Sequence, residues 1–141
     1  MARDSKDMAD YTKLNLRSDV DDMAPKFGMG SDIEARYART PLGLENSGAS
    51  YFKLAPDYRL PFGHTHAEQE ELYVVISGSA RFKAGEDIVE LAELDAIRVP
   101  GDTPRGMEAG PDGAEILAFG APNTDNKDAE MLQDFWPTEE D

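Results

Sequence analysis

The sequence contains no cysteine, which excludes several kinds of chemistry at once. Disulfide bonds, thiolate metal ligands and cysteine nucleophiles all need that side chain. No apolar run approaches the roughly 20 residues that span a bilayer, and the first residues mix acids with bases instead of leading into an apolar segment. We therefore expect a cytoplasmic protein without a signal peptide, held together by its core.

Basic side chains are scarce. The chain has 14 lysines and arginines against 29 aspartates and glutamates, a formal net charge of -15. Such a surface repels nucleic-acid phosphates and anionic lipids, so neither nucleic acid nor a membrane is an expected partner. The charge fits a salt-adapted protein and an ordinary acidic one equally well. At 141 residues the chain has the length of one domain.

Long helical patterns are missing between residues 33 and 120, where short apolar runs alternate with turns rich in glycine, proline and aspartate. Many short strands at near-even spacing predict an all-β barrel or sandwich. In the strand that begins at residue 71, apolar side chains occupy both faces, which predicts burial on both sides. The predicted strands are Ile33–Arg39, Ser50–Leu54, Glu71–Ile76, Ala80–Lys83, Ile88–Leu91, Ala96–Val99 and Glu115–Phe119.

The pattern divides the chain into three segments. Residues 1–32 form a polar N-terminal arm and an irregular wrapping segment, in which Asp10–Leu16 is a candidate short strand. Residues 33–120 form the barrel. Residues 121–141 form a tail, and no internal repeat or second domain is expected.

The tail is predicted to contain one short helix. Asp125 is a suitable N-cap for Asn126–Gln133, where two apolar residues lie three apart. Phe135 and Trp136 then give the tail an apolar anchor.

Both histidines of the chain lie close together, at His64 and His66, and Glu71 follows them. Residues two apart on a strand project from the same face, so the two imidazoles can meet at one point. A four-residue turn can return the Glu71 carboxylate to that point from the next strand. Two imidazoles and one carboxylate leave coordination positions open and suit Fe, Mn, Ni, Co or Zn, whereas Ca needs more oxygen ligands.

This stretch resembles the first conserved motif of the cupin superfamily, which reads Gly-x5-His-x-His-x(3,4)-Glu-x6-Gly. Tyr58 stands at the leading glycine position, and Glu70 would leave one residue too many before the last glycine. The resemblance covers about residues 45–120 and implies a double-stranded β-helix, the cupin or jelly-roll barrel, here with a short C-terminal helix. The residues that match in identity and spacing are His64, His66, Glu71 and Gly78.

The second cupin motif, Gly-x5-Pro-x-Gly-x2-His-x3-Asn, is matched only in part. Pro100 stands at its proline, but Arg105 replaces the last metal-binding histidine. Arginine is always cationic and rarely a metal ligand. The family's fourth ligand is therefore missing unless Glu108 or Glu115 substitutes, and strand parity turns Glu108 away from Arg105.

Two interpretations of Arg105 follow. In the first, three ligands hold a metal and Arg105 binds the carboxylate or phosphate of an anionic substrate. Tyr73 and Met107, which share the parity of Glu71 and Arg105, then line the pocket and contact the substrate. In the second, no metal binds and Arg105 forms a buried ion pair with Glu71, a geometry that suits a guanidinium.

The resemblance leaves three functions open. The first is a metal-dependent enzyme that acts on a small molecule by dioxygenase- or isomerase-like chemistry. The second is a non-catalytic binder of a small ligand, and the third is a metal-free structural cupin. Cupins of this size commonly form homodimers through N-terminal strands, so residues 10–17 are predicted to add to a partner's sheet.

Overall fold

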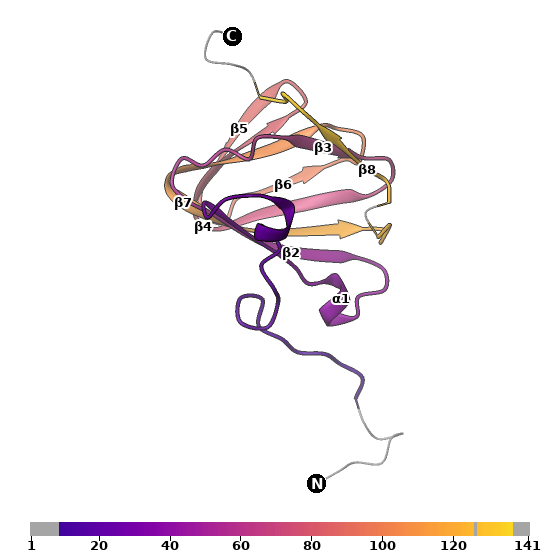
Figure 1. The fold of residues 1–141 in the computed structure, drawn as a ribbon. Coiled ribbons are helices and arrows are strands. Elements are labelled where there is room, and N and C mark those ends of the chain that lie inside the picture. Colours follow the sequence, from indigo (N-terminus) through magenta and orange to yellow (C-terminus); the bar gives the residue numbers. More distant parts are fainter. Residues whose placement is uncertain (1–8, 126, 137–141) are drawn as a thin grey trace.

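The computed structural model describes residues 9–125 and 127–136. Its strands curl round into a barrel, with helix α1 and the N-terminal segment at one end (Figure 1). The elements in chain order are η2 (Pro25–Phe27), β1 (Ile33–Tyr37), α1 (Arg39–Leu42), β2 (Gly48–Leu54), β3 (Gly63–His66), β4 (Glu70–Ala84), β5 (Asp87–Leu91), β6 (Ala96–Val99), β7 (Arg105–Ala121) and β8 (Ala129–Leu132).

Hydrogen bonding joins the eight strands into one curled sheet. The order is β1-β2-β7-β3-β8, and β4 pairs with β5, β6 and β7. All these pairs are antiparallel. The predicted all-β barrel is confirmed. Within the part of the chain that the structure describes, no helix has the length and apolar character to cross a bilayer.

The barrel has one fully buried face. On β4, Tyr73 and Val75 are 3% and 0% exposed, and they lie opposite buried Ala118 and Ile116 of β7. The other face of β4 carries Leu72, which is 40% exposed. The prediction that this strand is buried on both sides was therefore wrong, because the curled sheet encloses only one of its two faces.

Two sequences predicted as turns are bends inside long strands. β4 runs through Gly78 and joins two predicted strands, and β7 runs through Gly113 and extends the predicted Glu115–Phe119 back to Arg105. Both glycines have positive φ angles, 75° and 80°, and the register of β4 against β7 shifts around Gly78. Irregularities of this kind let a strand bend without ending.

Gly78→Ala is expected to destabilise the fold more than Gly85→Ala. Both positions have a positive φ, which costs an alanine about 1–2 kcal/mol. A Cβ on Gly78 would also lie 2.0 Å from the carbonyl oxygen of Gly113, whereas a Cβ on Gly85 would meet nothing within 4 Å. Urea unfolding of the two variants measures the difference, and equal losses would contradict a steric role for Gly78.

The N-terminal segment differs from the prediction. Asp10–Leu16 belongs to no strand, and Tyr11 is 74% exposed. In the structure this segment pairs with no strand, since apolar spacing alone does not make a strand. Its addition to a partner's sheet stays a prediction, and residues 1–8 of the predicted arm lie outside the described residues.

The predicted C-terminal helix was wrong. Ala129–Leu132 is strand β8, antiparallel to β3 along all four residues of both strands. Asp125, the expected N-cap, has a left-handed φ of 56°, and Asn126 lies outside the described residues. The backbone N–H and C=O groups of β3 need partners, and this long-range pairing outweighs a local helical spacing of two residues.

Trp136 fixes the end of the described chain, as predicted for the apolar anchor. Its side chain is 9% exposed, and its Nε1 donates a hydrogen bond to the Leu60 carbonyl at 3.0 Å. The Arg59 guanidinium covers the indole at 4.5 Å from the ring centroid. These contacts tie the chain after β8 back onto the barrel.

Candidate metal centre

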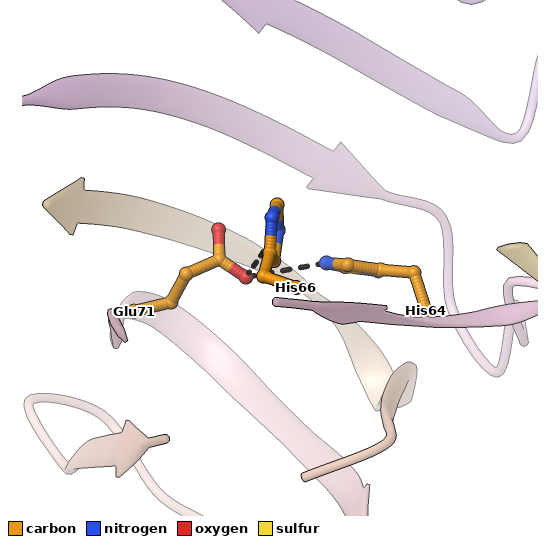
Figure 2. A group of neighbouring side chains, drawn as sticks. All are labelled: His64, His66 and Glu71. Atoms are coloured by element: carbon orange, nitrogen blue, oxygen red, sulfur yellow. Dashed lines mark hydrogen bonds and ion pairs between the residues drawn. The ribbon is translucent and has the colours of Figure 1, made fainter. Parts of the chain in front are cut away.

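Two strands that follow one another in the chain bring the predicted ligands together. His64 and His66 lie on β3, and Glu71 is the second residue of β4. Figure 2 shows the three side chains pointing toward one another, with one carboxylate oxygen of Glu71 facing both rings. Glu71 Oε1 is 3.2 Å from His64 Nε2 and 3.4 Å from His66 Nε2. One ligand atom of each residue lies within 4.8 Å of the others, so the group is close enough to hold a metal ion.

These distances and donor types fit a metal. Ligand atoms about 2.1 Å from one ion lie roughly 3.0 Å apart in octahedral and 3.4 Å apart in tetrahedral geometry. The two measured N···O distances, 3.2 and 3.4 Å, fall within or next to that range. Two imidazoles with one carboxylate suit divalent Fe, Mn, Ni, Co or Zn.

Asp128 orients one of the histidines. Its Oδ1 lies 3.0 Å from His66 Nδ1, and the same oxygen accepts a hydrogen bond from Thr124 Oγ1 at 2.5 Å. Its Oδ2 accepts the backbone N–H groups of Glu68 and Gln69, both at 2.9 Å. An ionised Asp128 accepts a hydrogen bond from Nδ1–H, which in the neutral ring leaves the Nε2 lone pair facing the centre.

The protonation states agree with this arrangement. Burial alone would raise the pKa of Asp128, but hydrogen bonds from Thr124, His66 and two backbone amides hold that pKa well below its usual range. Burial lowers the pKa of His66, yet its bonds to Glu71 and Asp128 outweigh burial and raise the pKa. Binding of a metal through Nε2 of His66 would therefore compete with protonation of that nitrogen.

No local pattern in the sequence pointed to Asp128 as a site residue. It lies 62 positions from His66, within the segment that was predicted to be a helix. The pairing of β8 with β3 is what brings it to the site.

Arg105 contacts the same carboxylate. Its side chain is 1% exposed, and Nη1 donates to Glu71 Oε1 at 3.1 Å. Nη2 donates to the carbonyl oxygens of Pro100 and Gly101, while Nε is buried without a hydrogen-bond partner. The buried ion pair between Arg105 and Glu71, which the metal-free interpretation predicted, is thus present. The terminal nitrogens of the guanidinium are bonded to protein groups.

Tyr73 completes the surroundings of Glu71. Its hydroxyl donates to Glu71 Oε1 at 2.6 Å. Burial and the nearby Glu71 charge raise the pKa of Tyr73 well above its usual value, so it stays a neutral donor. Burial would raise the pKa of Glu71, but hydrogen bonds from His64, His66 and Tyr73 lower it, so Glu71 stays a carboxylate.

The two alternative ligands lie elsewhere. Glu108 accepts a hydrogen bond from Arg59 at 2.7 Å, in agreement with the parity argument that turned it away from Arg105. Glu115 bonds to Tyr51 and Arg17. Neither supplies a fourth ligand to the group of His64, His66 and Glu71.

A cavity of about 320 Å³ opens beside these residues. Tyr73, Met107 and Arg105 all border it, together with the three candidate ligands. The cavity volume lies at the lower end of the range for small-molecule sites. The barrel therefore places the candidate ligands in the wall of an internal pocket.

No family model and no curated protein sequence matches the chain. Solved structures do. A cupin protein from Bacteroides fragilis is 22% identical, covers 83% of this chain and 88% of its own, and has a TM-score of 0.66. KdgF from Halomonas sp. is 17% identical over 80% of this chain and 95% of its own, with a TM-score of 0.63. A variant of Streptomyces PAC13, solved with uridine, is 16% identical over 89% and 93%, with a TM-score of 0.69.

Proposed function

We propose that this chain, which has the cupin fold, binds a divalent transition metal through His64, His66 and Glu71 and binds a small molecule in the adjoining cavity. One observation carries the proposal: the two imidazoles and the carboxylate meet at distances that suit ligands of a single ion. The cavity beside them supports a small-molecule ligand. PAC13, a protein of similar fold, has been solved with uridine, which supports the same class of ligand.

A metal bound there would supply Lewis-acid or oxygen-binding chemistry, as dioxygenase- or isomerase-like reactions need. The residues of the chain have separate tasks around it. Asp128 holds the His66 ring, and Tyr73 holds the Glu71 carboxylate. Met107 borders the space left for the ligand.

We assign charge balancing to Arg105. Its donors reach Glu71 and two carbonyl oxygens, and its side chain is 1% exposed. A direct bond to an anionic substrate would require these contacts to break. Its contacts therefore support a role beside Glu71 more than a role as a substrate-binding group.

Cobalt binding tests the metal proposal. Metal-depleted protein without an affinity tag is titrated with Co²⁺, and binding is followed by visible absorption and elemental analysis. We expect one equivalent to bind, and Glu71→Gln to weaken binding by more than about 100-fold, beyond the loss that outer-shell changes cause. Glu70→Gln is the matched control, because Glu70 is exposed and pairs with Arg98.

His66→Ala repeats the test with the Glu71–Arg105 pair intact. We expect it to lose cobalt as Glu71→Gln does, with circular dichroism showing that both variants are folded. An unaltered protein that binds no cobalt, or variants that bind it as tightly as the unaltered protein, would contradict the proposal.

The Arg105–Glu71 ion pair favours a second candidate, a barrel that binds its ligand without metal. In that case the guanidinium supplies the positive charge that balances Glu71. The cobalt titration separates the two candidates, since only the first requires the three ligand atoms to accept an ion.

A further inference from the structure

A second arginine borders the cavity at its open end. Arg39, the first residue of α1, lines the same cavity as the candidate metal ligands, and so does Asp125. Their side chains form an ion pair. They are 31% and 57% exposed, whereas the Arg105 side chain is 1% exposed. The Arg39–Asp125 pair therefore lies where the cavity meets solvent.

Hydrogen bonds between the two chain segments that carry Arg39 and Asp125 hold this pair in position. Asn123, two residues before Asp125, donates its side-chain N–H to the Glu45 carbonyl at 3.2 Å. Its backbone N–H donates to the Asn46 carbonyl at 3.0 Å. These bonds tie the segment after β7 to the segment between α1 and β2, and so hold Asp125 near Arg39.

The two arginines of the cavity differ in what holds them. Among the described residues that line the cavity, they are the only arginines or lysines. Arg105 is buried and bonded to Glu71 and two carbonyls. Arg39 pairs with an exposed aspartate, and exposed ion pairs contribute little to stability. An anionic group can therefore replace Asp125 on Arg39 at small cost.

The cavity wall between the candidate metal ligands and the Arg39–Asp125 pair is largely apolar. A ligand that fills this space gains from covering these side chains with an apolar body. The apolar side chains that line it include Met29, Ile33, Phe52, Phe62, Met107 and Met131.

We propose that Arg39 determines specificity by binding the anionic group of an amphipathic ligand, an organic acid whose apolar body occupies the cavity. Asp125 occupies the guanidinium until the ligand arrives. The inference rests on the proposed function in one respect, that the cavity is the ligand site. It does not depend on a bound metal.

Two fluorescent probes with the same rings test the proposal. 1-Anilinonaphthalene-8-sulfonate carries a sulfonate, and N-phenyl-1-naphthylamine lacks it. Each is titrated into the full, metal-depleted chain. We expect Arg39→Ala to weaken binding of the sulfonate probe about tenfold, as for loss of a charge-assisted hydrogen bond, and to change binding of the neutral probe less than about twofold.

Arg98→Ala is the matched control, because Arg98 is exposed and paired with Glu70 on another face of the barrel. It removes the same charge and should leave both probes unchanged. An equal loss in both arginine variants, or an equal effect on both probes, would overturn the assignment of Arg39.

Asp125→Asn tests whether the anionic group of the ligand replaces Asp125 on Arg39. It is expected to strengthen binding of the sulfonate probe several-fold in the unaltered background and to have no such effect together with Arg39→Ala. A gain of the same size in both backgrounds would show only a change of net charge and would contradict the exchange.

The probe and cobalt experiments test the two proposals independently of each other. Selective loss of the sulfonate probe in Arg39→Ala, with no cobalt bound, would support this inference and remove the metal. No binding of either probe to the unaltered chain would overturn this inference and leave the metal proposal standing.

Discussion

Glu71→Leu is expected to lower the free energy of unfolding of the metal-depleted chain by about 3–5 kcal/mol, because it leaves a buried charge without its partner. Arg105 is 1% exposed, and Nη1 loses its bond to Glu71 Oε1. The Tyr73 hydroxyl loses the same acceptor. Urea unfolding in the presence of a chelator measures the change.

Two further variants show whether the pair is the cause. Glu71→Leu combined with Arg105→Met removes both charges and should recover most of the lost stability, as buried ion pairs replaced by apolar residues often do. Glu70→Leu changes the neighbouring exposed position and should alter stability by less than about 0.5 kcal/mol. A double variant as unstable as Glu71→Leu would contradict the explanation.

Asp128→Asn is expected to weaken cobalt binding by about 10- to 100-fold, the usual loss when a carboxylate behind a metal-binding histidine is removed. Asp128 accepts a hydrogen bond from His66 Nδ1 at 3.0 Å and three further hydrogen bonds. Without its charge, the His66 ring is held less firmly and its Nε2 is a weaker ligand. The cobalt titration measures the loss.

Asp125→Asn is the matched control for this result. Asp125 lies three residues earlier, and its side chain pairs with Arg39. It should leave cobalt affinity unchanged. A similar loss in both variants would show a general effect of charge, and no loss in Asp128→Asn would show that His66 binds without this support. Urea unfolding of both variants distinguishes a weaker site from a weaker fold.

The sequence predicted the features that depend on neighbouring residues. The alternation of side chains in a strand has a period of two, so the barrel strands and the common face of His64 and His66 could be read directly. Glu71 follows after one short turn and lies in the next strand, as expected. The convergence of these three residues is therefore a local property of the chain.

The features that depend on distant residues could not be predicted. β8 forms because β3 has an edge to pair, which no local pattern around Ala129 reveals. Asp128 reaches the site through the same pairing. A glycine at position 78 is compatible with a turn between two strands and with a bend inside one strand. Its close packing against Gly113 makes it a bend within β4. Leu72 is apolar, yet it lies on the outer face of the curled sheet.

The pairing of β3 with β8 also sets an order for the assembly of the centre. β3 carries both histidines, but it meets β7 at one position and β8 at four. When the ribosome has just added His66, it has not yet made β8, which pairs with β3. It has also not yet made Asp128, which orients His66 from 62 positions later. Contacts across such separations form late during chain growth. The support of His66 by β8 and Asp128 therefore becomes complete only after translation has passed residue 132, and a metal that arrives earlier meets ligands that lack this support.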